Sequence, residues 1–147
     1  MKQIFPALCS ILLLTACTES TTEVKLNKFP VEEFSNIVAY QMNGEGEDAI
    51  FENGKLSKMI RGKKKELNAE QTMQLLEFLQ DKKAFGGTPA SCFNPHHAFV
   101  FYDEERPVAH LTLCMECGWM KSTPDLGGFA FSRKGKRQLM NLMNSIF

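Results

Sequence analysis

Residues 97–114 read HAFVFYDEERPVAHLTLC, and they carry the strongest signal of sheet structure in the chain. Two largely apolar segments, residues 97–102 and 108–115, flank the polar residues 103–107, and this pattern predicts a β-hairpin. We expect the apolar side chains of the hairpin to occupy core or half-buried positions of a sheet. These side chains are Phe99, Phe101, Leu111, Leu113 and Met115.

The pairing across the turn sets which side chains of this hairpin share a face. If Tyr102 pairs with Val108, three further pairs follow. They are Val100 with His110, Ala98 with Thr112, and His96 with Cys114. Opposed residues have Cβ atoms about 4.5–5.5 Å apart, so His96 and Cys114 would be close neighbours. A slip of one residue would place His97 there instead. His110 would lie about 13 Å further along the strand, where we expect a partly buried sheet histidine.

Local signals predict the other elements. Alternation predicts a strand at residues 36–42, and Asn53-Gly54 between residues 49–52 and 55–60 predicts a hairpin with a type I′ turn. Asn68 caps a predicted helix from residue 69 to about 82, and Ser132 caps a terminal helix. We expect the inward faces of the two helices to carry Thr72, Leu75, Leu76 and Leu79, and Leu139, Leu142, Met143 and Ile146.

The predicted order is β-β-β-α-β-β-α, with residues 129–131 as a short extended segment before the last helix. Short turns join consecutive strands, so we expect antiparallel pairing. The sequence therefore predicts a two-layer α+β domain: an antiparallel sheet of about five strands with two helices on one face.

The open end of the predicted hairpin gathers three cysteines and a histidine. Cys92 precedes the first strand, His96 begins it, Cys114 ends the second strand, and Cys117 follows one short turn later. Together they would form a Cys₃His metal site, with zinc as the expected ion and His97 as the alternative ligand. The segment 114–118, CMECG, has the spacing of a zinc knuckle, in which the glycine permits a tight turn.

Two other interpretations use the same cysteines. One is a disulfide with a leftover thiol, with Cys114–Cys117 or Cys92–Cys117 as the bond. The other is thiol redox or nucleophilic chemistry through Cys92, Cys114 or Cys117. A thioredoxin-like site needs its C-x-x-C at a helix N-terminus, and residues 118–124 do not resemble a helix. The metal site and the disulfide are therefore the stronger alternatives.

The N-terminal residues have the pattern of a signal sequence. Lys2 precedes a short apolar run at residues 4–14, and residues 14–17 read LTAC. This pattern resembles the lipobox of bacterial lipoproteins, which implies cleavage before Cys17 and a covalent lipid on that cysteine. The resemblance implies a signal peptide at residues 1–16, a lipidated tether at 17–28 and one globular domain at 29–147. Thr18 follows the cysteine, and by the same resemblance we expect the outer membrane, facing the periplasm.

Cleavage before Cys17 would change the length of the chain, its charge balance and its number of cysteines. Removing 16 of the 147 residues leaves 131, the size of one domain, with 16 basic and 17 acidic residues. This balance gives no reason to expect nucleic-acid binding. Cys9 would leave with the signal and Cys17 would carry lipid, so the domain would keep three cysteines in an oxidising compartment.

Two basic runs stand out, residues 61–65 (RGKKK) and 133–137 (RKGKR). We expect a solvated turn at the first and a solvated helix start at the second; contact with anionic lipid headgroups is the alternative for both.

The segment from Cys92 to Cys117 resembles small envelope lipoproteins of unknown function, which implies no particular activity. No paired-carboxylate, G-x-S-x-G, H-E-x-x-H or phosphate-loop motif is present. We therefore expect a lipid-anchored, non-enzymatic binding or accessory module with an envelope protein or ligand as partner. The alternative is a periplasmic thiol-redox or metal-dependent enzyme that uses Cys92, Cys114 and Cys117.

Overall fold

The computed structural model describes residues 29–30, 32–44, 50–52, 55–56 and 60–147. In this part of the chain, a six-stranded antiparallel sheet has the order β4-β1-β5-β6-β7-β8, and two short strands form a separate sheet. The large sheet contains β1 (Asn36–Met42), β4 (Ile60–Glu66), β5 (His97–Asp103), β6 (Arg106–Cys114), β7 (Trp119–Thr123) and β8 (Gly128–Ala130). The other elements are β2 (Phe51–Glu52), β3 (Lys55–Leu56), α2 (Ala69–Gln80), the 3₁₀ turn η1 (Lys82–Ala84) and α3 (Arg133–Ile146). The predicted α+β class is confirmed.

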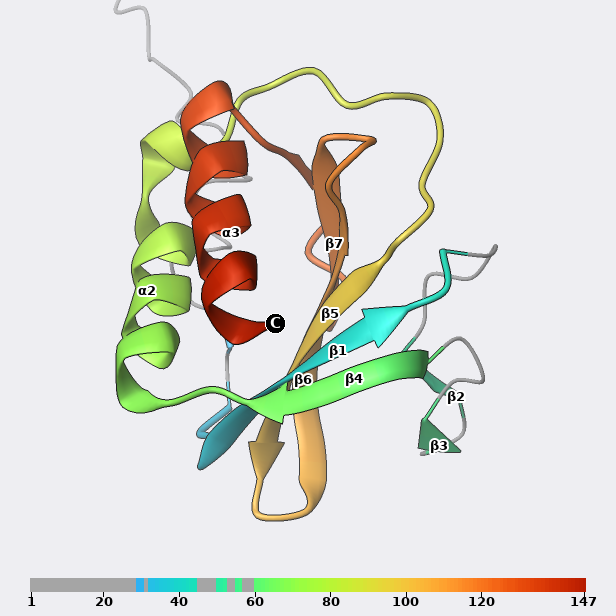
Figure 1. Cartoon of the computed structure of the whole chain (residues 1–147), viewed down its shortest axis with the longest axis vertical. Coiled ribbons are helices and arrows are strands. Elements are labelled where there is room, and N and C mark those ends of the chain that lie inside the picture. Colours follow the sequence, from blue (N-terminus) through green and yellow to red (C-terminus); the bar gives the residue numbers. More distant parts are fainter. Residues whose placement is uncertain (1–28, 31, 45–49, 53–54, 57–59) are drawn as a thin grey trace, which may run out of the picture.

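The two helices lie side by side on one face of the large sheet, as Figure 1 shows. The main core fills the space between the helices and this face of the sheet. From the sheet it receives alternate residues of β5 and β6, and all of them are almost completely buried: Phe99, Phe101, Leu111 and Leu113. Met115 is partly buried against the same core, so all five side chains have the core or half-buried positions that were predicted.

Helix α2 begins where the sequence predicts. The Asn68 side chain accepts a hydrogen bond from the Gln71 N–H at 2.9 Å, and the Asn68 N–H donates to Gln71 Oε1 at 3.1 Å. This reciprocal capping box satisfies two backbone donors that a helix start would leave unpaired. The helix ends at Gln80, two residues earlier than predicted, and its buried face contains Phe78 beside Leu75 and Leu79.

Helix α3 also begins as predicted, because the Ser132 hydroxyl accepts a hydrogen bond from the Gly135 N–H at 3.1 Å. The four predicted inward residues are all buried. The basic run of residues 133–137 lies in the first turns of this helix, where the helix dipole disfavours positive charge. Asp81 offsets part of that charge, since its carboxylate lies 2.6 Å from Lys134 Nζ. The hydrogen bond from Lys134 lowers the pKa of Asp81.

The hairpin of β5 and β6 has the predicted register over most of its length. Val100 pairs with His110 and Ala98 with Thr112. The pairing of Tyr102 with Val108 was wrong, because a register shift after Phe101 pairs Tyr102 with Pro107. Both strands consequently extend further, and the connection shortens to Glu104 and Glu105.

The second predicted hairpin does not join the main sheet. Strands β2 and β3 pair with each other and form the separate two-stranded sheet, while Asn53 and Gly54 lie outside the described residues. Ile50 and Phe51 pack with β1 and β5 residues on the face of the large sheet that the helices leave open, which we call the outer face. A small second core therefore lies on the outer face, around Tyr40, Met42, Ala98 and Val100.

The basic run of residues 61–65 was predicted as a turn, but it lies in strand β4, which pairs with β1. Lys63, Lys64 and Lys65 are exposed, so the expectation of solvated side chains is met. Strand β4 has a partner on one side only in the order of the sheet. Lysines on such an edge disfavour pairing with other chains, so the run has a structural reason for its charge.

Candidate functional site

The turn between β6 and β7 contains a disulfide. Cys114 ends β6, and its sulfur is bonded to Cys117, with the two Cα atoms 5.2 Å apart. Gly118 follows with a φ of +77°, a conformation that favours glycine, and its N–H donates to the Cys114 carbonyl at 2.9 Å. The glycine predicted to permit a tight turn therefore has this role. The Cys117 N–H points at Cys114 Sγ, 3.1 Å away.

A free thiol lies against this disulfide. Cys92 Sγ is 3.2 Å from Cys117 Sγ, although the two residues are 25 positions apart in the chain. Cys92 is exposed, whereas Cys114 and Cys117 are 0% and 4% exposed. The three predicted cysteines therefore meet, with an accessible thiol beside a buried bond.

Two hydrogen bonds tie the Cys92 segment to the β6–β7 turn. The Ala90 N–H donates to the Cys117 carbonyl at 2.9 Å, and the Trp119 indole N–H donates to the Cys92 carbonyl at 3.1 Å. The first bond is made two residues before Cys92 and the second at Cys92 itself. The backbone around Cys92 is thus attached to the residues that carry and follow the disulfide.

Aromatic packing strengthens this attachment. The Phe93 ring lies 4.6 Å from the Trp119 ring, and Lys121 Nζ lies 4.5 Å from the Phe93 centroid and 5.3 Å from that of Trp119. Such cation–π contacts contribute about 0.5–1 kcal/mol at exposed sites. Gly128 on β8 makes room for the indole, because a Cβ there would lie 2.7 Å from it. Phe93, Trp119 and Lys121 therefore hold the loop against the sheet.

The two candidate histidines lie on opposite faces of the sheet. His96 lies against Gly44, where a Cβ would come within 2.5 Å of its Nε2 atom. His97 lies beside Phe147 of the helix layer, with ring centroids 6.1 Å apart. Burial, and to a smaller extent the neighbouring His96, lowers the pKa of His97. Because side chains alternate along β5, only His96 shares a face with Cys114.

The predicted metal site needs the sulfur atoms of Cys114 and Cys117 as ligands, but in the structure these two atoms form a disulfide. Within the residues that the structure describes, no three His, Cys, Asp or Glu side chains are grouped so that they could hold a metal ion. Zinc binding by Cys114 and Cys117 requires both as thiolates, so the predicted zinc site concerns the reduced chain and stays a prediction.

The outer face also contains two buried polar side chains on β6. His110 is 6% exposed and Thr112 is 1% exposed, and among the residues that the structure describes neither His110 Nε2 nor Thr112 Oγ1 has a hydrogen-bond partner. The Phe51 ring lies 6.0 Å from the His110 ring. Burial lowers the pKa of His110 to about 4. His110 therefore lies in the sheet, as predicted. It is almost completely buried, whereas the prediction was partial burial.

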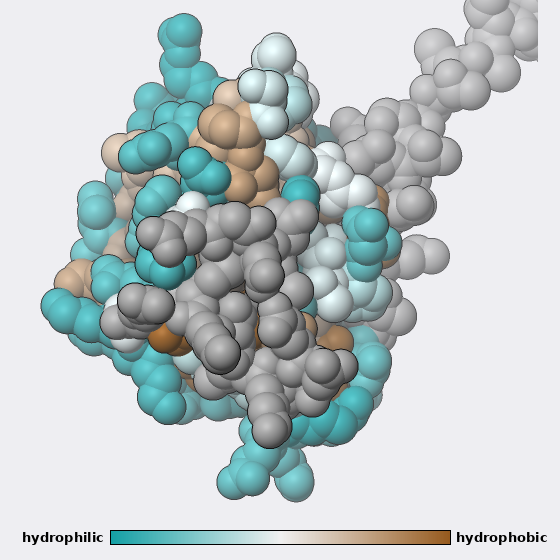
Figure 2. All heavy atoms as spheres, turned by 90° about the vertical axis from the view of Figure 1, so that its right-hand side faces the viewer, coloured by the Kyte–Doolittle hydropathy of each residue, from teal (hydrophilic) through white to brown (hydrophobic). Residues whose placement is uncertain are grey.

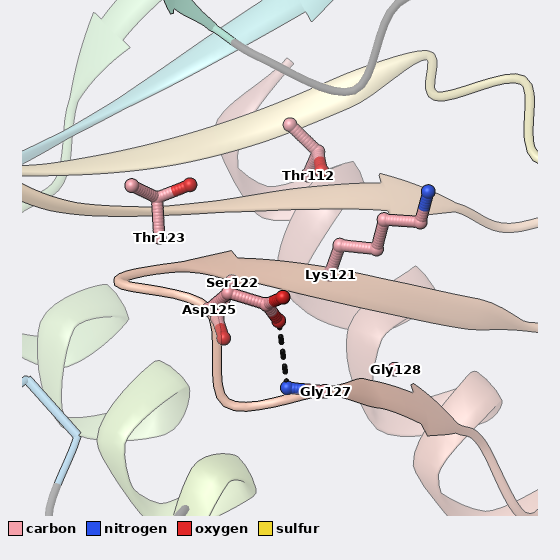
Figure 3. A pocket seen from close by; sticks show the side chains of 7 residues that line it. All are labelled: Thr112, Lys121, Ser122, Thr123, Asp125, Gly127 and Gly128. Carbon is pink, nitrogen blue, oxygen red and sulfur yellow. Dashed lines mark hydrogen bonds between the residues drawn. The ribbon is translucent and has the colours of Figure 1, made fainter.

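Thr112 lines a cavity of about 350 Å³ on the outer face. Figure 3 shows Thr112, Lys121 and Thr123 on two neighbouring strands, with Asp125 and Gly127 on the connection that follows them. The Gly127 N–H donates to Asp125 Oδ1 at 2.8 Å. The described surface on the side that carries β2 and β3 is mostly hydrophilic, with smaller apolar areas (Figure 2).

Sequence reasoning missed the residues that position the thiol. Strand β7 was not predicted, although Trp119, Lys121 and Thr123 alternate with Met120 and Ser122, which are buried. That alternation was the available signal for a half-buried strand. The attachment of Trp119 to Cys92 joins residues 27 positions apart and has no local signal.

Comparisons with known proteins give this chain no relatives. No family model, no curated protein and no solved structure matches it. In the part of the chain that the structure describes, no helix is both long enough and apolar enough to cross a bilayer. Residues 1–28, which contain the predicted signal peptide, Cys17 and the tether, lie outside the described residues.

Proposed function

We propose that this chain is a lipid-anchored protein of the cell envelope, which acts as a non-enzymatic binding or accessory module. A covalent lipid on Cys17 holds it at the outer membrane, facing the periplasm, and residues 17–28 connect the lipid to the domain. Several acyl chains, at about 0.8 kcal/mol for each buried CH₂ group, give stable anchoring. An envelope protein or a ligand is the expected partner.

The observation that carries this proposal is the disulfide between Cys114 and Cys117. Disulfides persist in oxidising compartments such as the periplasm, so the bond agrees with the lipobox-like residues 14–17. The bond closes a very short loop, for which the chain-entropy model gives about 2 kcal/mol of stabilisation. It therefore supports an exported domain that is reinforced where β6 turns into β7.

The cavity of Figure 3 supports the binding part of the proposal. Its lining residues include Thr112, Ser122 and Thr123, which carry hydroxyl groups, and the charged residues Lys121 and Asp125. Such a lining suits a small polar ligand better than an apolar one.

Fractionation of cells that express the full chain tests the anchoring. We expect the wild-type chain in the membrane fraction, with its N-terminus at a lipidated Cys17 by mass spectrometry. Cys17→Ser should move the chain to the soluble fraction or leave its precursor unprocessed, since the acylated sulfur is lost. Cys9→Ser is the matched control and should leave anchoring unchanged. An acylated, membrane-bound Cys17→Ser chain would overturn the proposal.

Zinc is the proposed cofactor of the reduced form, held by Cys92, His96, Cys114 and Cys117. Elemental analysis of the full chain, purified with and without a reductant, measures it. About one zinc per reduced chain, lost in Cys114→Ser, is the expected result. A reduced chain without metal would remove zinc from the proposal and leave the disulfide interpretation.

One observation favours the alternative of a thiol-redox protein. The accessible Cys92 sulfur lies only 3.2 Å from a disulfide sulfur, which a purely structural disulfide does not require.

A further inference from the structure

Two cysteine sulfurs compete for the same partner at the β6–β7 turn. Cys117 Sγ is bonded to Cys114 and lies 3.2 Å from Cys92 Sγ, about 1 Å more than the length of a disulfide bond. Only a small movement therefore separates this arrangement from one in which Cys117 is bonded to Cys92. We propose that Cys92, Cys114 and Cys117 form a thiol–disulfide exchange site whose substrate is an external thiol.

The first step is an exchange within the chain. Cys92 loses its proton to solvent, and its thiolate attacks Cys117 Sγ. The Cys92–Cys117 bond forms while the Cys114–Cys117 bond breaks, and the electron pair of the broken bond stays on Cys114 Sγ, which takes up a proton. One disulfide and one thiol are present before and after, so the step needs no oxidant or reductant.

The surroundings favour this step at the attacking sulfur of Cys92 and at the leaving sulfur of Cys114. The Cys117 N–H, 3.1 Å from Cys114 Sγ, stabilises the negative charge that develops on the leaving sulfur. The Cys92 backbone is held in place by the hydrogen bonds of Trp119 and Ala90, which limits the freedom lost when the new bond forms. The attacking sulfur and the leaving sulfur are thus both positioned by the backbone.

The exchange changes whether the disulfide is accessible to solvent. The Cys114–Cys117 bond is buried, since these residues are 0% and 4% exposed, whereas Cys92 is exposed. In the exchanged form, an external thiolate attacks the Cys92 sulfur. A mixed disulfide forms at Cys92, and Cys117 leaves as a thiolate. The site therefore offers a protected bond in one form and a reactive bond in the other.

Serine variants of the full chain test the first step by acid quenching, alkylation and peptide mapping. We expect Cys114→Ser to contain a Cys92–Cys117 disulfide and Cys92→Ser to keep Cys114–Cys117. Cys117→Ser, the matched control, should contain neither, because the shared partner is lost. A Cys114→Ser chain with both thiols free, or a Cys92–Cys114 disulfide in Cys117→Ser, would overturn the proposal.

The wild-type chain provides a measurement that does not depend on the folding of a variant. Alkylation without a reductant, with the reagent dilute enough that exchange precedes labelling, should give some chains labelled on Cys114 and others labelled on Cys92, because each chain has one free thiol and Cys114 becomes free only after exchange. Label confined to Cys92 would contradict the exchange. Anchoring through Cys17 is measured separately, so failure of one proposal leaves the other standing.

Reduced glutathione serves as the probe for the second step. We expect it to attach at Cys92 in Cys114→Ser, on the order of tenfold faster than it opens the buried bond of Cys92→Ser. Equal rates in the two variants, or attachment at Cys117 in Cys114→Ser, would show that the exposed Cys92 sulfur is not the point of attack.

Discussion

The two faces of strands β5 and β6 are equally buried but differ in chemistry. On the helix side, Phe99, Phe101 and Leu111 are completely buried in an apolar core. On the outer face, His110 and Thr112 are nearly as buried, yet each has a polar atom without a hydrogen-bond partner in the described part of the chain. On the helix side the hairpin therefore contributes to an apolar core, whereas on the outer face the apolar Ala98 and Val100 lie among buried polar side chains.

The largest expected effect concerns the helix side. Phe101 contacts the rings of Phe29 and Phe34 edge-on, with centroids 5.4 and 5.2 Å away. Phe101→Ala should lower the free energy of unfolding by about 3–5 kcal/mol, because it removes these contacts and leaves a cavity. Urea denaturation measures the loss. Val100→Ala, its neighbour on the outer face, should cost only about 2 kcal/mol; an equal cost would abolish the difference between the faces.

Lowering the pH should reduce the stability of the fold through His110 on the outer face. Burial holds the pKa of His110 at about 4, whereas the unfolded chain has the ordinary value of about 6.5. The unfolded state therefore binds the proton first. The stability that depends on neutral His110 is complete above pH 6.5 and is lost as the pH falls toward 4, by about 3 kcal/mol. The facing residues Phe51, Val100 and Thr123 carry no charge that would offset this loss.

Denaturation of wild type and His110→Gln between pH 7 and pH 4 checks this expectation. The variant should lose markedly less stability over that range, because its side chain does not titrate. His97→Gln should remove a smaller part of the pH dependence, since burial lowers the pKa of His97 in the same direction. Parallel curves for wild type and His110→Gln would contradict the assignment.

The smallest expected effect is a gain. Thr112 Oγ1 is buried without a partner, and an unsatisfied buried hydroxyl costs about 1–3 kcal/mol. Thr112→Val should therefore raise the free energy of unfolding by about 1 kcal/mol, measured by thermal or urea denaturation. Thr123→Val, on the neighbouring strand, should change stability less. A loss in Thr112→Val would mean that the hydroxyl stabilises the fold.

The parts of the fold that the sequence predicted correctly have local signals. Asn68 and Gln71 are three residues apart, as are Ser132 and Gly135, and each pair forms its cap within one helical turn. The register of Val100 with His110 follows from a hairpin whose strands are separated by a short connection. In each case the interacting groups lie close together in the chain, so few alternatives compete.

The incorrect predictions concern contacts for which the sequence has no local signal. Strands β2 and β3 were expected in the main sheet, but they form their own and pack on the outer face. Their Asn-Gly signal describes how they pair with each other and says nothing about which sheet they join. The convergence of Cys92 with Cys117 was predicted, but the hydrogen bonds that hold Cys92 there depend on the path of the loop that precedes β5.

The sequence by itself determined the fold class, both helix starts and the alternation that separates the faces of the hairpin. Hydrogen bonds within a turn and the two-residue period of a strand act over short distances along the chain, so a single sequence displays them. Only the packing of distant segments decided that the exposed Cys92 thiol lies beside the buried disulfide, that His96 rather than His97 shares a face with Cys114, and that Trp119 holds Cys92. Those contacts join elements distant in sequence, and they exist only after the strands and the loop have packed together.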